Sequence, residues 1–395
     1  MKIATLTLLC AALSSGADMA DLKRDCTENH TFASFRNCLI DTFTVRPVHL
    51  IAANVVPGGG TAVGLRYTRA FEGSWHPEFT AAAASSLRAF WFTEAKLTLT
   101  HRVLDGPQDI FGMHIYSKTR NLPQLPYYGL GPGVSTGARA DYQMNDQRVG
   151  VDASFPLTDW VNIGGIFENL WTSVDPITDP DIHSIETRYN DVTAPGLLRQ
   201  PTMLHSEVFI RPHFSGMPPY WLDYKIAYGF YHDTGTGEFS FRRFSADVRH
   251  QLYLERTGGQ VNRDSVIDLR GYFSTATAGA GHRVPFYLQE TIGGSDITGS
   301  SALRGFIDYR FRGPHVVLFQ AEFSRRIWGP LGLMAFYDAG TVALLRSDLD
   351  LKNLKHSFGF GLTGWAAGKV VFKAYIGLGS GEGRHPYFGI PAGLI

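Results

Sequence analysis

The chain has few cysteines and no excess of charge of either sign. Of its 395 residues three are cysteines, and 36 Lys and Arg residues balance 36 Asp and Glu residues. A net charge of zero removes any overall electrostatic attraction for nucleic acid or for an anionic surface. Outside the N-terminal apolar run only Cys26 and Cys38 remain. Without a second cysteine pair or a suitably placed histidine, they make a poor zinc site.

Long apolar runs are also missing. Beyond the N-terminus no uninterrupted apolar stretch reaches about 18 residues, which excludes a membrane-spanning helix. A membrane-spanning β-strand needs only about nine to eleven residues of alternating character, so a barrel stays possible. Aromatic residues make up 13% of the chain, charged residues 18%, and there are 43 glycines. This composition suits an all-β protein.

The sequence lacks the common catalytic motifs. It contains neither G-x-S-x-G nor HExxH, and its 14 histidines are scattered. The triplet at 233–235, Asp-Thr-Gly, copies that of aspartic proteases, but their chemistry needs a second carboxylate and no second copy occurs. A turn explains it better. We therefore expect no enzyme, cofactor or metal, although a hydrolase site assembled from separate strands remains an alternative.

The N-terminus has the pattern of a secretory signal peptide. Lys2 precedes an apolar run from Ile3 to Leu13, and small residues follow. This predicts a signal peptide over residues 1–20, with cleavage after Ala17 or Ala20. The protein is thus expected to be exported.

Residues 21–45 are expected to form a short periplasmic leader. It holds Cys26 and Cys38, and an oxidising compartment favours a disulfide between them over two free thiols. The leader is interpreted as an ordered segment tied by this disulfide, or alternatively as a gate at the periplasmic mouth of a barrel.

Several segments alternate between apolar and polar residues with period two. Between Val317 and Ile327 one face carries Val317, Phe319, Ala321, Phe323 and Ile327, and the other carries polar residues such as Glu322. A strand of this kind must bury its apolar face in a protein core or in lipid. The same alternation occurs in residues 149–155, 222–230, 267–273 and 370–378.

Strand length and aromatic placement favour lipid over a second sheet. The segments run about ten to fifteen residues, whereas strands of soluble sandwiches typically have five or six. Aromatic residues gather near segment ends, as expected for the interfacial girdles of a membrane barrel. The ends in question carry Phe90, Trp91, Phe92, Tyr127, Tyr128, Trp160, Trp171, Tyr220, Trp221 and Trp328.

The spacing of these segments predicts an all-β, transmembrane antiparallel β-barrel of about 16 strands over residues 46–395. Long connections at 119–138, 172–202, 277–314 and 343–355 alternate with short turns, as in barrels with loops on one side. The expected strands are 46–56, 61–71, 79–88, 91–101, 110–118, 139–155, 160–171, 203–213, 221–231, 238–254, 265–276, 315–327, 331–342, 356–365, 369–378 and 384–393.

The longest connection, 277–314, carries an arginine among small residues. Gly293 and Gly294 open the segment, and the tetrapeptide Leu303, Arg304, Gly305 and Phe306 follows. With the inward-facing Glu322 and the stretch 336–342, this set resembles the BamA/TamA family of sixteen-stranded outer-membrane barrels, also called bacterial surface antigens. The resemblance is most specific over residues 290–378.

The resemblance implies that 277–314 is a sixth outer loop folded into the lumen, with residues 303–306 at its tip. By the same resemblance Glu322 and Asp338 are acidic partners of Arg304, and Phe336 is the aromatic residue beside them. The alternation independently places these three side chains on the inward face. A guanidinium held bidentately by carboxylates would be a strong, directional tether.

Two departures from the family pattern qualify the implied function. Too few residues precede the first strand for a periplasmic POTRA domain, and Pro386, Pro391 and a final isoleucine predict a short or weak last strand. The expected function is membrane-protein assembly or translocation by a monomer in the bacterial outer membrane. Besides outer-membrane lipid, its expected partner is a periplasmic protein or an unfolded outer-membrane protein substrate. A passive or gated solute pore remains the alternative.

Overall fold

The structure is a computed structural model that describes residues 26, 47–103, 110–179, 181–214, 220–257, 260–366 and 369–389. The expected signal peptide lies outside these residues, as does the leader except for Cys26. Cys26 takes part in a disulfide bond, and its expected partner Cys38 lies outside the described residues.

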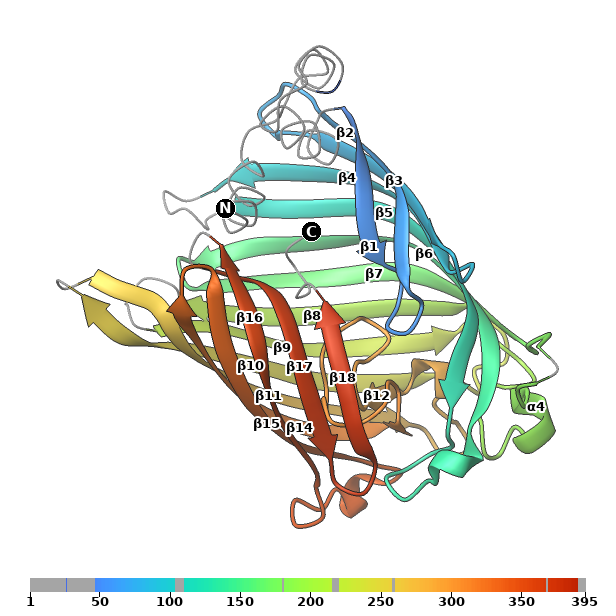
Figure 1. Ribbon diagram of the computed structural model, residues 1–395. Coiled ribbons are helices and arrows are strands. Elements are labelled where there is room, and N and C mark those ends of the chain that lie inside the picture. Colours follow the sequence, from blue (N-terminus) through green and yellow to red (C-terminus); the bar gives the residue numbers. More distant parts are fainter. Residues whose placement is uncertain are drawn as a thin grey trace.

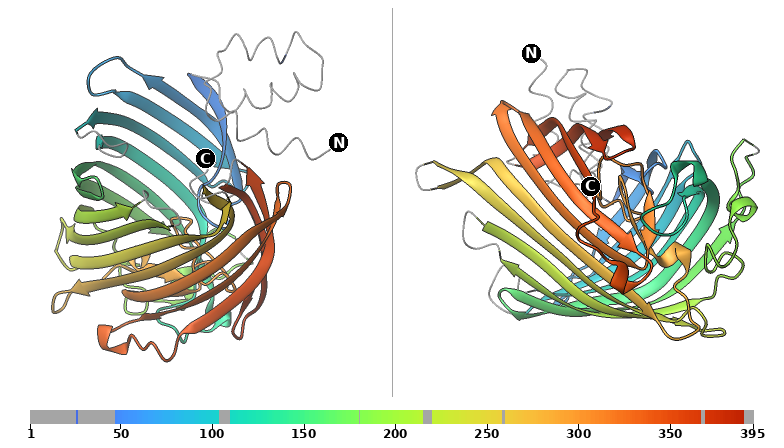
Figure 2. Two further views of the ribbon diagram at one scale, coloured as in Figure 1. Left: turned by 90° about the vertical axis from the view of Figure 1, so that its left-hand side faces the viewer. Right: turned by 90° about the horizontal axis from the view of Figure 1, so that it is seen from below.

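One antiparallel sheet of 16 strands forms the wall of the molecule. Each strand pairs with the next strand of this sheet along the chain, so the order is a simple meander that curves into a barrel (Figures 1 and 2). The prediction of an antiparallel barrel of about 16 strands is confirmed. Its strands are β1 (Val48–Asn54), β2 (Thr61–Ala70), β3 (Glu78–Ser86), β4 (Trp91–Arg102), β5 (Ile110–Tyr127), β6 (Ala140–Thr158), β7 (Val161–Asp175), β8 (Met203–Phe214), β9 (Tyr220–Asp233), β10 (Phe241–Thr257), β11 (Gln260–Ala278), β14 (His315–Trp328), β15 (Leu331–Ala343), β16 (Lys355–Ala366), β17 (Lys369–Gly379) and β18 (Gly383–Gly389).

The two ends of the barrel differ in their connections. At one end, called the loop end here, lie the long segments 128–139, 176–202, 279–314 and 344–354; short turns such as 159–160 and 329–330 mark the other, the turn end. The loop segments contain the short helix α4 (Ile185–Arg188) and a separate two-stranded sheet of β12 (Glu290–Ile292) and β13 (Phe311–Gly313). No helix in the described ranges is both long and apolar enough to cross a membrane.

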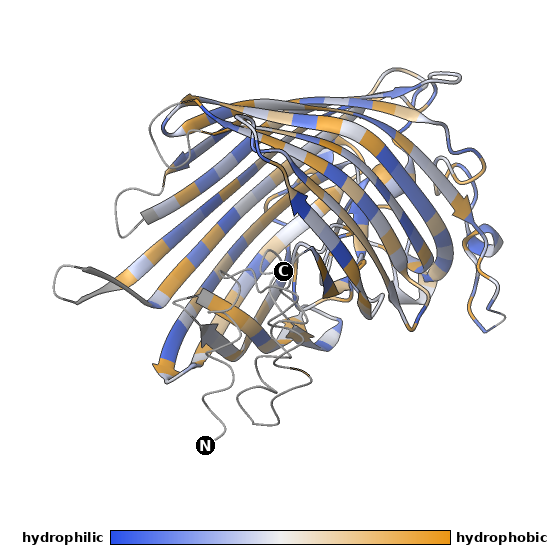
Figure 3. Cartoon of the chain, turned by 90° about the horizontal axis from the view of Figure 1, so that it is seen from above, coloured by the Kyte–Doolittle hydropathy of each residue, from blue (hydrophilic) through white to orange (hydrophobic). Residues whose placement is uncertain are grey.

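Hydrophilic and hydrophobic residues alternate along the strands (Figure 3), which divides the wall into an apolar outer face and a polar inner face. On β14 the outward side chains Phe319, Phe323 and Ile327 are 47%, 39% and 58% exposed, although they are large and apolar. Such a surface is stable against hydrocarbon and would be unfavourable in water.

The inner face carries paired charges. Lys225 on β9 lies 2.8 Å from Glu207 on β8, and Arg211 on β8 lies 2.7 Å from Asp223 on β9. Each pair joins neighbouring strands across the ladder. Opposite charges therefore pair on the lumen side of β8 and β9.

At the loop end the lumen is filled by an apolar core. Tyr127 of β5 and Tyr142 of β6 pack edge-to-face on Phe286, which comes from segment 279–314, and all three are nearly or fully buried. The same cluster includes Val56 from the turn after β1, Phe90 from the turn before β4, and Leu197 from segment 176–202. This end of the barrel is therefore packed with side chains.

Strand β5 extends further than the sequence predicted. Residues 119–127 were expected to begin the long connection 119–138, but they continue β5 to Tyr127. A register shift between Leu122 and Leu125 accommodates Pro123 in the ladder with β6. Burial of Leu122 and Leu125 in the loop-end core compensates for the lost backbone hydrogen bonds.

The first and last strands are the two ends of the strand order. Within the described residues β18 pairs with β17 and β1 pairs with β2, and no ladder joins β1 to β18. β18 is short, at 7 residues, and Pro386 within it lacks a donor for a further ladder.

Because the wall has an apolar outer face and a polar inner face, the effect of a new charge on stability should depend on the face that receives it. Ile115 of β5 points outward and is 45% exposed. Ile115→Arg should lower the free energy of unfolding in lipid vesicles by about 2–4 kcal/mol, because it places a guanidinium in hydrocarbon. Urea unfolding followed by tryptophan fluorescence measures the change.

Thr100→Arg is the matched control. Thr100 shares its face with Thr98, whose hydroxyl is bonded to the ring of the inward-pointing His114. An arginine there reaches the lumen, so stability should change little. Equal losses from both substitutions would contradict the assignment of faces.

Candidate functional site

The segment between β11 and β14, residues 279–314, is called the sixth loop here. It lies inside the curved wall of strands, drawn in orange in Figures 1 and 2. β12 and β13 close the base of its hairpin. At Gly293 (φ +123°) and Gly294 (φ +56°) a Cβ would lie 2.5 Å from Cβ of Arg310 and 2.4 Å from Oδ1 of Asp308. Only glycine fits this turn.

Arg304 stands at the tip of the sixth loop and binds two carboxylates of the wall. Its Nε and one terminal nitrogen donate to Oδ2 and Oδ1 of Asp338 on β15, at 3.0 and 2.7 Å, and its backbone N–H donates to Oδ2 at 2.9 Å. The other terminal nitrogen donates to Glu322 on β14. The side chains of Arg304 and Asp338 are 5% and 0% exposed, so this is a desolvated, bidentate ion pair.

Further polar groups complete the coordination of both carboxylates. Gln320 and Ser357 each donate to Asp338 at 3.3 Å. Lys373 of β17 donates to Oε1 of Glu322 at 2.5 Å, and Ser324 donates to the same oxygen at 3.2 Å. The site therefore balances two acids against two bases contributed by four separate segments. This is the arrangement in which a buried charge cluster is tolerated.

Phe336 covers the guanidinium from one side. The Cζ atom of Arg304 lies 3.8 Å from the centre of the Phe336 ring, close enough for a cation–π interaction. Tyr375 packs edge-to-face on Phe336 at 5.1 Å. Burial by itself would lower the pKa of Arg304, but Asp338 and Glu322 raise it above its ordinary value, so the side chain stays charged.

The tip touches the backbone of β17 directly. A Cβ at Gly305 would lie 2.4 Å from the carbonyl carbon of Leu378. Seen from the wall, a Cβ at Gly377 would lie 2.3 Å from the carbonyl oxygen of Arg304, and one at Gly379 would lie 2.2 Å from that of Gly305. The loop and the wall approach each other at positions where neither can carry a side chain.

Leu303 and Phe306 anchor the tip by apolar contact. Leu303 is fully buried and adopts a positive φ of 42°, and Phe306 packs edge-to-face on Phe311. Both belong to a cluster that includes Val316 and Leu318 of β14. The structure thus brings together all seven residues that the sequence singled out at the tip and on the wall: Leu303, Arg304, Gly305, Phe306, Glu322, Phe336 and Asp338.

Two further arginines of the sixth loop were missed by the sequence reasoning. Arg310 and Arg312 are 3% and 4% exposed. Arg310 donates to Glu382 in the β17–β18 turn at 2.6 Å and to the carbonyl of Val134 at 2.6 Å, and Arg312 donates to the carbonyl of Phe286 at 2.6 Å. The alternation Tyr-Arg-Phe-Arg at 309–312 was the available signal.

The sixth loop also reaches the beginning of the sheet. The hydroxyl of Tyr309 donates to the carbonyl of Pro57, in the turn after β1, at 2.9 Å. Since Arg310 binds Glu382 beside β18, adjacent residues of the loop contact both ends of the strand order. The loop therefore bridges the interval where β1 and β18 do not pair.

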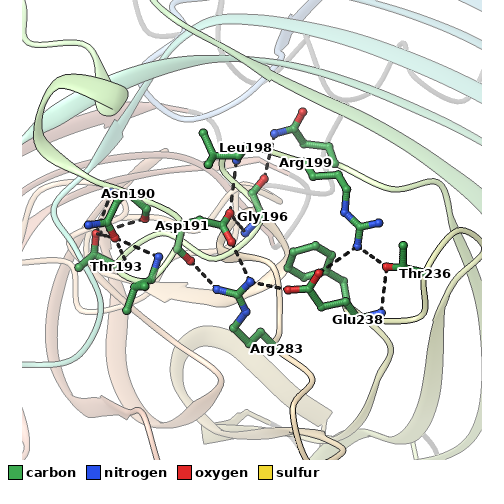
Figure 4. A network of polar contacts seen from close by, with 12 residues as sticks. Asn190, Asp191, Thr193, Gly196, Leu198, Arg199, Thr236, Glu238 and Arg283 are labelled. Atoms are coloured by element: carbon green, nitrogen blue, oxygen red, sulfur yellow. Dashed lines mark hydrogen bonds and ion pairs between the residues drawn. The ribbon is translucent and has the colours of Figure 1, made fainter.

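Outside the tip, three loop-end connections are joined by a network of ion pairs (Figure 4). Arg283 of the sixth loop lies 2.8 Å from Asp191 and also pairs with Glu238, and Arg199 pairs with Glu238 and with Asp233 at 3.3 Å. Asp233 begins the turn expected from its Asp-Thr-Gly sequence, accepting from the N–H of Gly235. Most of these side chains are more than a third exposed, so the network orients the loops and adds modest stability.

In the part of the chain that the structure describes, no group of three or more His, Cys, Asp or Glu side chains could hold a metal ion. His205, on β8, lies in the lumen wall with Nδ1 2.8 Å from Oε1 of Glu168, and the two side chains are 5% and 6% exposed. Tyr116 donates to the other oxygen of Glu168 at 2.7 Å.

Comparison with known proteins identifies similar folds. No family model and no curated protein matches the sequence. Among solved structures, the chain is similar to CdiB from Escherichia coli, with a TM-score of 0.52, 12% identity, and 87% of this chain and 61% of that chain covered. It is also similar to BamA from Haemophilus ducreyi lacking POTRA domains 1–3, with a TM-score of 0.50, 12% identity, and coverage of 96% and 81%.

CdiB from Acinetobacter baumannii aligns as well, at 13% identity and a TM-score of 0.49, and the chain spans 55% of that protein's length. At these identities the likeness concerns the fold alone. The fold is that of outer-membrane β-barrels of the BamA and CdiB type.

The contacts of Arg304 with Asp338 and Glu322, called the tether here, predict that Arg304→Ala releases the sixth loop. Asp338 and Glu322 would then face each other in the lumen without the guanidinium, at a cost of about 3–5 kcal/mol. Limited proteolysis of the protein in detergent should cut residues 293–310 much faster than in the unmodified protein. Mass spectrometry of the fragments locates the cut.

Arg346→Ala is the control, because Arg346 lies exposed in the short helix after β15 and its loss should leave the cleavage rate unchanged. Gly377→Val tests the same contact without altering charge, since its side chain would collide with the backbone of Arg304. Unchanged protection in both Arg304→Ala and Gly377→Val would contradict the tether.

Proposed function

We propose that this protein is a bacterial outer-membrane barrel that assists the assembly or translocation of other proteins, with a lumen closed at the loop end by the tethered sixth loop. We propose further that it is exported, acts as a monomer and performs no catalysis. The observation that carries the proposal is the buried contact of Arg304 with Asp338 and Glu322. This contact matches the loop tip of the BamA/TamA family, which the sequence resembles.

The packing of the lumen argues against a simple diffusion pore. A pore needs a continuous aqueous path, but the loop end is filled by side chains with almost no exposure, among them Tyr127, Tyr142 and Phe286. Ion pairs between loop connections lie over this core. Solute passage would require the sixth loop to leave the lumen.

The ends of the sheet offer a place for a polypeptide substrate. β1 and β18 each pair on one side only within the described residues, and an unpaired strand edge is a template for hydrogen bonding to another extended chain. An unfolded outer-membrane protein, delivered by a periplasmic partner, could add its strands there. The polar wall of the turn end would face that partner.

A hydrolase is the second candidate, supported by one observation. Nε2 of His205 is buried without a hydrogen-bond partner in the described part of the chain, while Glu168 holds Nδ1. A carboxylate-oriented imidazole with a free nitrogen is what a general base requires. Lipid or ester hydrolysis that is abolished in His205→Gln would favour this candidate over the first.

The proposed function predicts low conductance in planar bilayers. The unmodified protein should show a small and rare current, and Arg304→Ala should show larger and more frequent openings because its loop is free to leave the lumen. Arg346→Ala should match the unmodified protein. A large, steady conductance of the unmodified protein would identify a pore instead.

Assembly activity is tested directly with a denatured outer-membrane barrel protein as substrate. Vesicles that contain this protein should accelerate the folding of the substrate several-fold over empty vesicles, measured as its protease-resistant fraction with time. Arg304→Ala should remove most of the gain. Folding at the rate of empty vesicles, with and without a periplasmic extract, would count against the proposal.

A further inference from the structure

A cavity of about 320 Å³ lies at the loop end, between the sixth loop and both ends of the sheet. Its floor is the buried tip of the sixth loop, including Phe306 and Tyr309. The turn after β1 forms one wall at Gly58, and β18 forms the other at His385 and Tyr387. The volume is at the lower end of the range of small-molecule sites, about 300–1,000 Å³.

One side chain that lines this cavity has a buried nitrogen without a partner in the part of the chain that the structure describes. Nε2 of His385 is buried without a hydrogen bond. The side chains of Tyr128, Tyr375 and Tyr387 also line the cavity, although none of their hydroxyls is among the buried unpaired groups. A buried polar group left unpaired is unfavourable, so Nε2 of His385 indicates a polar occupant.

The aromatic rings provide flat surfaces around the same space. Tyr375 and Tyr387 are stacked, with ring centres 4.8 Å apart and planes inclined by 15°. Tyrosine combines an apolar face, which attracts polarised C–H groups, with a hydroxyl that donates and accepts. A ligand with alternating C–H and hydroxyl groups would use both.

Two of the three arginines that line the cavity are already neutralised by carboxylates. Arg139 is bound bidentately to Asp141 at 2.8 and 2.7 Å, and Arg304 is bound to its two carboxylates. The Arg88 guanidinium donates to the carbonyl of Gly58. Asp308 has one oxygen held by the N–H of Ser295, and burial raises the pKa of its carboxyl because the charged form is poorly solvated there. The same poor solvation disfavours a charged ligand.

We propose that this cavity is a binding site for an uncharged saccharide unit, with the Tyr375–Tyr387 pair as its stacking surface and Tyr128, His385 and Asp308 as its hydrogen-bonding groups. Tyrosine hydroxyls and an imidazole can each donate or accept, which suits sugar hydroxyls because these also do both. The rim residues Gly58, Arg88 and Pro386 are exposed. A sugar can therefore enter from the loop end, either free in solution or as the head group of a glycolipid.

The experiment uses the full-length protein in a zwitterionic detergent that carries no sugar. Glucose, N-acetylglucosamine and maltose are the free probes, and saturation-transfer NMR measures their binding. Vesicles of phosphatidylethanolamine with and without a neutral glucosyl lipid are the membrane probes, read out by the shift in thermal unfolding. Binding of the free sugars identifies a soluble ligand, whereas an effect of glucosyl vesicles alone identifies a lipid head group.

Tyr128→Phe and His385→Phe should each weaken binding by roughly tenfold, the loss of about one hydrogen bond. Since no hydrogen bond joins either group to the described residues, both variants should unfold at the normal temperature and keep the sixth loop protected from protease. Tyr228→Phe, on the lipid-facing side of β9, is the control and should bind normally.

Three outcomes overturn the proposal: none of the sugars or glucosyl vesicles binds, the Tyr128 and His385 variants bind as well as the unmodified protein, or vesicles without glycolipid produce the same shift. Protease protection of the sixth loop and bilayer conductance are measured on the same samples. A failure of the saccharide site is thereby distinguished from a failure of the proposed assembly function, on which this inference does not depend.

Discussion

Each strand of the barrel wall separates hydrocarbon from a polar interior, and because side chains alternate, its register decides which residues meet which medium. On β14 this constraint turns Phe323 toward lipid and Glu322 toward the lumen. A slip by one residue would exchange them and place a carboxylate in hydrocarbon. The same constraint on β15 turns Asp338 inward. The two acids therefore point into the lumen, where Arg304 of the sixth loop pairs with both and Lys373 of the wall pairs with Glu322.

The sixth loop supplies the cation that pairs with these acids, and it also buries arginines that need partners. Its three buried arginines, Arg304, Arg310 and Arg312, each need partners, and they find them on β14 and β15, in the β17–β18 turn and on the loop itself. Glycines at 305 and 377 allow the backbones to meet, and apolar clusters exclude water from the contacts. Wall and loop are thus mutually dependent. The same arrangement leaves the saccharide cavity between the loop tip and the two ends of the sheet.

Much of the wall could be predicted because its signal is local. Period-two alternation located β14 within one residue of its observed end, but it placed the end of β5 at residue 118, before Pro123, whereas the strand continues to Tyr127. There, burial of Leu122 and Leu125 outweighs the tendency of proline to interrupt a strand. The tether residues were singled out through a family resemblance. Alternation indicated that Glu322 and Asp338 face inward, but it did not indicate which residue they bind.

By itself the sequence determined the fold class, the strand count and the face of each strand, since each depends on neighbouring residues and on the two media they must satisfy. Tertiary structure alone decided how the lumen is closed, which partners Arg310 and Arg312 take, and where the cavity lies. Those contacts join distant positions: Tyr309 and Pro57, which hydrogen-bond, are 252 residues apart. No local pattern encodes such a contact, because it exists only after the sheet has curved and brought its two ends together around the loop.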